Sequence, residues 1–167
     1  MLSSEKQAPL LATKRAIDIH GDNLIKGVLD MRNNNTKVKI GDDLKWNVFT
    51  EHREVYHREL LSAKEADELG VSVSSVLRER IEVGGAVLPH YHDVAEVIHI
   101  TKGKVKLLQN GEWKSYKEGD TFLVPTGVVH SVANDDVEPT EQISIFIPVH
   151  EGIQNENFAS HMVEQEK

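Results

Sequence analysis

Between residues 71 and 150, short runs rich in valine and isoleucine are broken by glycine, proline and asparagine at close intervals. Asn110-Gly111 lies between two such runs and is a strong signal for a two-residue hairpin. Regularly spaced short strands with turn residues between them are typical of an all-β sandwich or barrel. We therefore predict an antiparallel β-barrel over residues 71–150, with strand breaks at turn residues such as Gly84-Gly85.

The segments on either side of this region are more polar. In residues 1–70, Leu44, Trp46 and Val48 alternate with polar neighbours, which predicts a strand. These 70 residues are too polar to form a core of their own. We therefore interpret residues 1–70 as an N-terminal arm rather than an independent domain, and residues 151–167 as a loosely held polar C-terminal tail.

The arm also carries a helix signal. Ser62 and Glu65 stand three residues apart, which is the spacing of a capping box at the start of a helix. Glycine is the residue that most often follows the end of a helix. The pattern predicts a short helix that begins after Ser62 and ends at Gly70.

Composition excludes several classes of function. The chain of 167 residues has 19 Lys and Arg against 27 Asp and Glu, and this net charge of −8 would repel a nucleic-acid backbone. The absence of cysteine excludes disulfides, iron–sulfur clusters and thiolate-bound zinc. No apolar stretch is long enough for a signal peptide or a membrane span. We expect a cytoplasmic protein that acts on a small molecule, with neither nucleic acid nor membrane as a partner.

Three histidines and one glutamate are the candidate metal ligands. His90 and His92 are two residues apart, which places both side chains on one face of a strand. Glu96 follows beyond an expected turn, and His130 follows a second turn much later in the chain. Imidazole and carboxylate together suit Fe, Mn, Co, Ni, Cu or Zn better than Ca or Mg. Taken alone, however, a pair of histidines on an apolar strand is more often structural than ligating.

The chain resembles the cupin family in two motifs that are complete and in the right order. The first is Gly84-x5-His90-x-His92-x3-Glu96-x6-Gly103, and the second is Gly119-x5-Pro125-x-Gly127-x2-His130-x3-Asn134. This resemblance implies a small antiparallel jelly-roll barrel that holds one metal ion through His90, His92, Glu96 and His130. It says much less about the N-terminal arm.

Four protein ligands leave positions open in a six-coordinate shell, as expected of a reactive rather than a structural site. We expect one divalent transition metal per chain, with iron as the first choice and Mn, Ni, Zn, Co or Cu as alternatives. Alternation along the strands predicts an apolar lining near the metal and directs His99 away from it. The expected lining residues are Leu88, Ile98, Ile100 and Val132.

Glu79 is a candidate for proton transfer. The neighbours Leu77, Ile81 and Val83 suggest that the odd-numbered face of this strand points into the barrel, which would bring Glu79 inside. The interpretation that we favour from sequence is different: Glu79 lies at the barrel mouth, paired in solvent with an adjacent arginine. Exposed charge pairs of this kind are common on protein surfaces.

Tyr56 and His57 are weaker candidates. They lie in residues 50–59, a strongly charged stretch that we interpret as a solvated face. The alternative is that this stretch covers an opening of the barrel, so that Tyr56 or His57 reaches the substrate.

The fold does not determine the reaction. Our first hypothesis is an iron-dependent dioxygenase of a small organic substrate, because Glu96 is the only evident base near the metal. The alternatives are a redox-neutral metal-dependent isomerase, epimerase or lyase of a sugar or organic acid, and a non-catalytic small-molecule-binding protein. We also expect a homodimer, in which the arm strand around Trp46 pairs with an open sheet edge of its own chain or of a neighbour's.

Overall fold

The computed structural model describes residues 36–148 and 158–163. Residues 1–35 of the predicted arm, and residues 149–157 and 164–167 around the predicted tail, lie outside the described residues. The elements are η1 (Gly41–Asp43), β1 (Asn47–Val48), β2 (Arg53–Ser62), α2 (Ala63–Leu69), β3 (Ser75–His92), β4 (Ala95–Lys102), β5 (Lys104–Gln109), β6 (Glu112–Lys117), β7 (Thr121–Val124), β8 (His130–Asn134), β9 (Thr140–Ile147) and β10 (Ser160–Met162).

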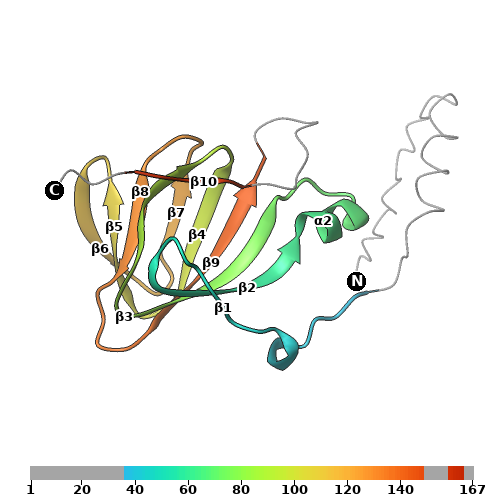
Figure 1. The fold of residues 1–167 in the computed structure, drawn as a ribbon, viewed down its shortest axis with the longest axis horizontal. Coiled ribbons are helices and arrows are strands. Elements are labelled where there is room, and N and C mark those ends of the chain that lie inside the picture. Colours follow the sequence, from blue (N-terminus) through green and yellow to red (C-terminus); the bar gives the residue numbers. More distant parts are fainter. Residues whose placement is uncertain (1–35, 149–157, 164–167) are drawn as a thin grey trace, which may run out of the picture. The chain divides into compact units, whose positions relative to one another are not determined.

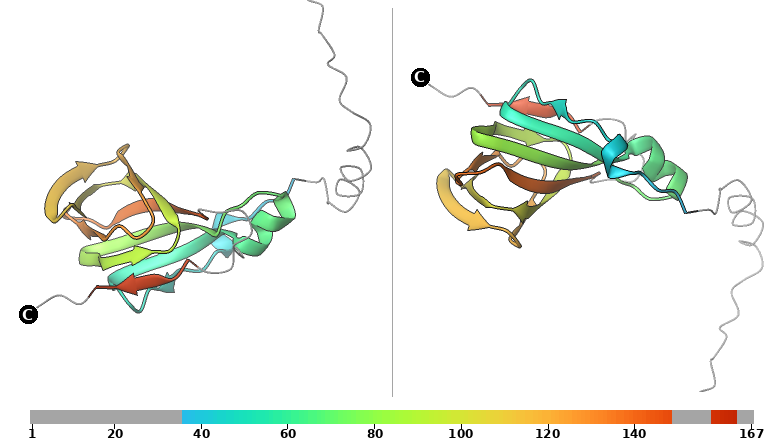
Figure 2. Two further views of the ribbon diagram at one scale, coloured as in Figure 1. Left: turned by 90° about the horizontal axis from the view of Figure 1, so that it is seen from above. Right: turned by 90° about the horizontal axis from the view of Figure 1, so that it is seen from below.

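The described strands form one antiparallel sheet that curls on itself into a half-barrel of jelly-roll type, as predicted (Figures 1 and 2). The strand order is β6-β5-β8-β3-β9-β4-β7, while β2 and β10 pair with β3 and β1 pairs with β2. The early part of β3 pairs with β2 and β9, and its last part pairs with β8 and β10. β3 therefore connects the two halves of the curled sheet.

The predicted break at Gly84-Gly85 is wrong, because β3 continues through both glycines. A side chain at Gly85 would place its Cβ 2.8 Å from the carbonyl oxygen of Glu82 and 2.9 Å from that of Glu54. Glycine is therefore required here for close approach of two backbones, rather than for a turn that ends the strand. The exposed Val83 just before it also corrects the expectation that this side chain points inward.

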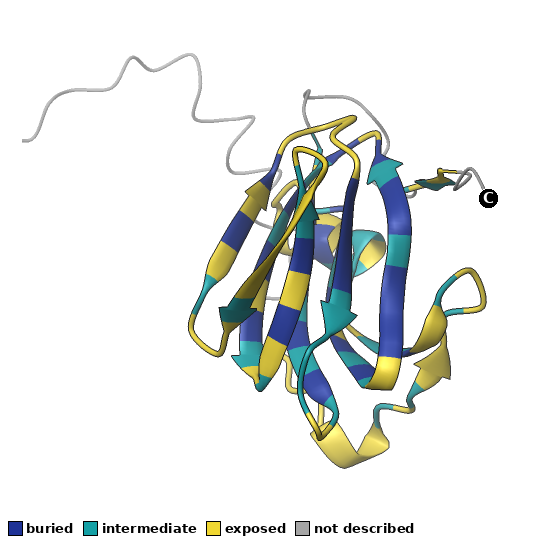
Figure 3. Ribbon diagram, turned by 90° about the vertical axis from the view of Figure 1, so that its left-hand side faces the viewer, coloured by how far each residue is buried: buried dark blue, intermediate teal, exposed yellow. Residues whose placement is uncertain are grey.

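Buried and exposed residues alternate along most of the strands (Figure 3). The main cluster contains Val55, Ile81, Val87, Ile98, Ile100, Val105, Leu107, Phe122, Val124 and Val132. A second, smaller cluster contains Leu77, Val94 and Phe146, with Phe49 and Phe158 packed against it. Phe158 comes from the C-terminal segment, so this segment contributes to the interior of the fold.

The short helix is confirmed. Ser62 and Glu65 form the capping box in both directions, and Gly70 ends α2 with a φ of 75°. No helix in residues 36–148 and 158–163 is long and apolar enough to cross a membrane.

The expected solvated face between residues 50 and 59 is largely a strand instead. β2 pairs with β3 along most of its length and buries Val55 completely. In contrast, the expected strand at Leu44–Val48 is reduced to the two residues of β1. The charge of residues 50–59 hides their strand character, because the pattern alone does not reveal that β3 lies alongside.

Candidate metal centre

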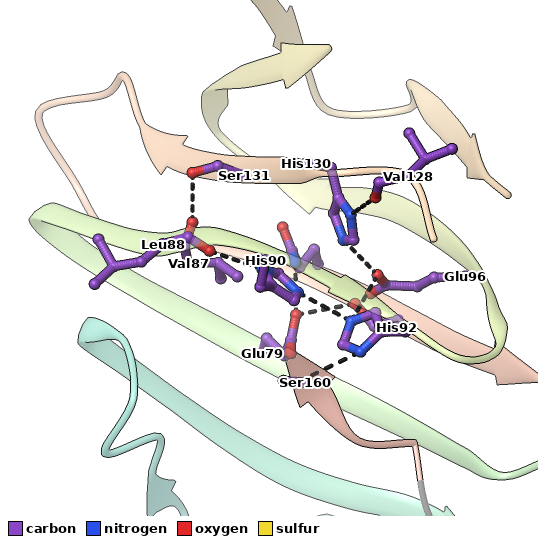
Figure 4. A network of polar contacts seen from close by, with 12 residues as sticks. Glu79, Val87, Leu88, His90, His92, Glu96, Val128, His130, Ser131 and Ser160 are labelled. Carbon is purple, nitrogen blue, oxygen red and sulfur yellow. Dashed lines mark hydrogen bonds and ion pairs between the residues drawn. The ribbon is translucent and has the colours of Figure 1, made fainter. Parts of the chain in front are cut away.

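The four predicted ligands meet at one place inside the half-barrel. His90 and His92 lie at the end of β3, Glu96 near the start of β4, and His130 at the start of β8. Each offers one atom to a set in which all atoms lie within 4.8 Å of one another. All four residues are at least 96% buried. Figure 4 shows the imidazoles and the carboxylate turned toward a common point.

Each imidazole is held by a hydrogen bond on the side away from this point. The Nδ1–H of His90 donates to the Leu88 carbonyl at 2.7 Å, and that of His130 donates to the Val128 carbonyl at 2.9 Å. His92 Nδ1–H donates to a carbonyl at 3.1 Å that belongs to the C-terminal segment. These bonds place the hydrogen of the neutral ring on Nδ1, so that the Nε2 lone pair faces the centre.

This donor set requires a positive charge between its members. The Nε2 atoms of His90 and His92 are 2.9 Å apart, and the same distance separates His130 Nε2 from Glu96 Oε2. Lone pairs at such distances repel unless a proton or a metal ion lies between them. Three nitrogen donors and one carboxylate oxygen are a set that binds divalent transition metals. The residues present therefore fit a divalent transition metal ion.

Without a metal ion, a proton can supply the positive charge among these four side chains. Burial lowers the pKa of His90 to about 3, so this ring stays neutral. Burial also opposes charge on His130, but the hydrogen bond to Glu96 outweighs it and raises the pKa of His130. Likewise, burial opposes charge on Glu96, but the hydrogen bond from His130 and the nearby imidazoles bring its pKa to about 2. One proton held by the His130–Glu96 pair thus occupies the place that a cation suits.

The apolar lining agrees with prediction at three positions out of four. Ile98, Ile100 and Val132 are buried in the main cluster. Leu88 is only half-buried, and Val87 takes its place in the core. The cause is a register shift between Val87 and His90 where β3 pairs with β8, because an irregularity of this kind reverses the alternation of side chains.

His99 points away from the centre, as predicted. Its side chain is exposed, and its Nδ1 lies 2.8 Å from the Thr121 hydroxyl on the neighbouring strand β7.

Glu79 corrects the interpretation that we favoured from sequence. It is only 4% exposed and lies inside the barrel, where Gln142 donates to its Oε2 at 2.5 Å and the Ser144 hydroxyl does so at 2.9 Å (Figure 4). Burial, assisted by the charge of Glu96, raises the pKa of Glu79 to about 7, although the hydrogen bonds from Gln142 and Ser144 oppose the rise. The adjacent arginines pair elsewhere: Arg78 contacts Glu141, and Arg80 contacts Glu82.

Tyr56 and His57 separate onto opposite faces of β2. Tyr56 lies opposite Arg80, whose guanidinium sits over its ring on the outer face, so Tyr56 does not reach the interior. His57 lies opposite Glu79 and stacks on Phe49, with ring centroids 4.2 Å apart. Its buried Nδ1 has no hydrogen-bond partner in the described part of the chain.

His52 is a residue that sequence reasoning missed. Its ring centroid is 5.2 Å from that of His90, and the Leu88 N–H donates to its Nδ1 at 3.2 Å. Burial lowers the pKa of His52 to about 4, so the ring is neutral at physiological pH and carries its hydrogen on Nε2. The charged stretch around it gives no sign of this position, which depends on how β2 approaches β3.

A cavity of about 330 Å³ borders His130, between the hairpin of β5 and β6 and the strand β7. Its walls are uncharged apart from the histidine itself. They consist of Leu107, Leu108, Gln109, Asn110, Tyr116, Thr121, Phe122, Leu123, Val124, Pro125, Val128, Val129 and His130. The volume suits a small organic molecule.

Comparison with known proteins gives one family match. A family model described as "Cupin domain" matches residues 77–146. An uncharacterized protein from Aquifex aeolicus (strain VF5) is 38% identical over 66 residues, which is 39% of this chain. The matched segment spans only 54% of the length of that protein.

Solved structures share the fold at low sequence identity. The polyketide cyclase RemF from Streptomyces resistomycificus has a TM-score of 0.64 and 16% identity, covering 80% of this chain and 89% of its own. A predicted oxalate decarboxylase from Thermotoga maritima has a TM-score of 0.61 and 21% identity, covering 68% of this chain and 100% of its own. At these identities the two structures establish a common fold alone.

Proposed function

Because this chain belongs to the cupin superfamily, we propose that it is a metal-dependent enzyme that catalyses a redox-neutral proton transfer on a small organic molecule, as isomerases and lyases do. The observation that carries the proposal is the buried carboxyl group of Glu79. The lack of a base other than Glu96 favoured a dioxygenase from sequence, and the position of Glu79 inside the barrel removes that reason.

His90, His92, Glu96 and His130 would hold the metal ion in this proposal. A divalent ion there would act as a Lewis acid on an oxygen of the substrate, which makes a proton on the adjacent carbon easier to remove. The buried apolar surroundings exclude water from the centre and strengthen electrostatic interactions within it.

Glu79 has the properties of a group that carries a proton. A pKa of about 7 makes the proton-free and proton-bound forms similarly populated at neutral pH, which suits a general base that becomes a general acid. The bonds from Gln142 and Ser144 both end on Oε2 and fix the side chain. No side chain in the described residues donates to Oε1, so Oε1 is the oxygen that would take a proton from a substrate in this proposal.

His52 supplies a hydrogen-bond donor. The Leu88 N–H occupies its Nδ1, so the hydrogen on Nε2 is available to an oxygen of a molecule bound next to His90. A neutral imidazole in this role stabilises negative charge that develops on the substrate. The cavity of about 330 Å³ borders the same centre from the side of His130 and offers room there for part of a small molecule.

A second candidate is the iron-dependent dioxygenase. It is favoured by the donor set of three histidines and one carboxylate together with the buried apolar residues Ile98, Ile100 and Val132. The two candidates differ in what they consume, since a dioxygenase uses dioxygen and a proton transfer does not.

Exchange of carbon-bound hydrogen tests the proposal. The purified protein is incubated in D2O with a panel of 2-oxo acids and β-diketones, exchange is followed by 1H NMR, and dioxygen is followed in parallel. We expect exchange without dioxygen uptake. Glu79→Gln should keep the metal content and lose exchange by about 100-fold or more. Glu141→Gln is the control, because this carboxylate pairs with Arg78 at the sheet surface.

The double variant His90→Ala/His130→Ala should lose both metal and exchange. A Glu79→Gln protein that exchanges at the wild-type rate would contradict the role of Glu79, and full metal content in the double variant would contradict the ligand assignment. Dioxygen uptake with any member of the panel would support the dioxygenase instead.

A further inference from the structure

The C-terminal residues 158–163, here named the brace segment, lie against the part of β3 that carries two ligands. β10 pairs antiparallel with β3 so that Ser160 is opposite His92 and Met162 is opposite His90. The Val163 N–H extends the pairing by donating to the Pro89 carbonyl at 3.0 Å. The segment predicted as a loose tail therefore contains a strand at the metal centre.

His92 differs from the other two histidines in where its Nδ1 acceptor comes from. The acceptors of His90 and His130 are carbonyls two residues earlier in the chain, so local backbone geometry provides them. The acceptor of His92 is the carbonyl of Ala159 at 3.1 Å, which is 67 residues later in the chain, and the hydroxyl of the next residue, Ser160, lies 3.4 Å from the same Nδ1. Among the three imidazoles, only His92 depends on the brace segment for its tautomer.

Side-chain contacts hold the brace segment on both sides of Ala159. Phe158 stacks on Phe146 with ring centroids 4.0 Å apart and planes 16° apart, and Phe146 meets the edge of His92 at 5.1 Å. On the other side, His161 stacks on Tyr91, and its Nε2 lies 2.9 Å from an Asp93 carboxylate oxygen. These contacts fix the position of the Ala159 carbonyl, which faces Nδ1 of His92.

We propose that the brace segment is part of the metal centre: the Ala159 carbonyl holds His92 in the Nδ1–H tautomer and thereby determines how tightly the metal is bound. Without this acceptor the ring can carry its hydrogen on Nε2, and its lone pair is then on Nδ1, which faces away from the centre. Loss of a hydrogen-bond partner behind a ligating histidine typically weakens metal binding by about 10- to 100-fold. This inference rests on the proposed function only in taking these four residues to be a metal site.

Truncation separates the brace segment from the residues that follow it. Zn2+ affinity is measured by chelator competition for the full chain, for residues 1–156, and for residues 1–163 as the matched control. We expect residues 1–156 to bind Zn2+ about 10- to 100-fold more weakly, and residues 1–163 to match the full chain. Equal affinity of all three proteins would overturn the inference.

Phe158 allows the same test without shortening the chain. Phe158→Ala removes the stacking on Phe146 and should weaken Zn2+ binding, whereas Phe158→Tyr keeps the ring and should restore it. If residues 1–156 fail to fold, the comparison of Phe158→Ala with Phe158→Tyr tests whether the brace segment sets Zn2+ affinity. Equal affinity of the Ala and Tyr variants would then overturn the inference.

The tautomer itself can be read from the 15N shifts of the imidazoles in the metal-free protein. We expect His92 to be the Nδ1–H form in the full chain and to lose that preference in residues 1–156 and in Phe158→Ala, while His90 stays unchanged. A purely structural role would lower stability without this selective change. A full chain that binds no Zn2+ would overturn both the proposed function and the inference. A full chain that binds Zn2+ while these variants change neither tautomer nor affinity would overturn the inference alone.

Discussion

Glu79 shows how an ionisable side chain is kept in the interior of this fold. Its place on β3 directs it inward, and the neighbouring strand β9 offers the amide of Gln142 and the hydroxyl of Ser144 as donors. These two bonds satisfy one oxygen but do not offset the loss of hydration, and burial is the main reason that the pKa rises to about 7. A buried carboxyl with a pKa this high links the stability of the protein to pH.

Between pH 4.5 and about 7, the unfolded chain releases the proton of Glu79 while the folded chain keeps it. The folded state then binds more protons, so the free energy of unfolding falls as pH rises through this window. The total for this group is on the order of 3 kcal/mol. We expect Glu79→Gln to become more stable relative to wild type as pH rises from 4.5 to 7, and the difference to stay constant above that. Urea unfolding of the metal-free proteins measures it, and parallel pH profiles would contradict the shift.

At the level of residues, the sequence identifies the four metal-centre side chains because their spacing matches two complete motifs. It does not identify His52, whose place beside His90 depends on the approach of β2 to β3. It also misplaces Glu79, because the adjacent arginines suggest ion pairs with it. In the structure Arg78 pairs with Glu141 on β9, and Arg80 pairs with Glu82 on its own strand. The local sequence pattern shows which residues share a face of one strand. Which side chains meet across neighbouring strands is determined by the fold.

The turn before β8 is the element that delivers His130 to the centre. Gly127 has a φ of 74°, its N–H donates to the His92 carbonyl at 2.9 Å, and Val128 accepts from the ring of His130. A side chain at Gly127 would meet no atom within 4 Å, so Gly127→Ala introduces backbone strain without a clash. We expect it to cost about 1 kcal/mol of stability and to weaken metal binding.

Gly111 provides a matched control for this turn. It has a φ of 80° in the hairpin between β5 and β6, and it also has open space around its Cα. Gly111→Ala should therefore cost a similar amount of stability and leave Zn2+ affinity unchanged. Chemical unfolding and chelator competition measure the two effects. Equal metal affinity of both variants would show that the turn at Gly127 does not position His130.

At the level of elements, strong turn chemistry and alternation are enough for much of the half-barrel. The hairpin at Asn110-Gly111 and the helix between Ser62 and Gly70 are confirmed because a few local contacts define them. β2 is missed because its charged residues hide the alternation, and β10 is missed because its three residues, Ser160–Met162, are too few to carry a strand pattern. Both strands form against β3, and this long-range pairing has no local signal.

For the molecule as a whole, the oligomeric state stays a prediction. Within the single chain, β1 pairs with β2, and Trp46 lies over the guanidinium of Arg58 at 4.3 Å on the outer face. The arm strand thus has a partner in its own chain along one edge. In the described residues its other edge carries no strand, and Val48 on β1 is 60% exposed. An apolar residue on an open edge strand favours pairing with a second copy.

We therefore expect a homodimer in which the free edges of β1 from two chains meet. Light scattering should give twice the chain mass of 18.8 kDa for wild type, and 18.8 kDa for Val48→Lys, because a lysine on an edge strand opposes edge-to-edge pairing. Val137→Lys is the control, since Val137 is 88% exposed in the loop between β8 and β9. A wild-type mass of 18.8 kDa would exclude the dimer. A dimer that survives Val48→Lys would place the interface on another part of the barrel, because two β1 edges cannot come together across facing lysines without bringing like charges into contact.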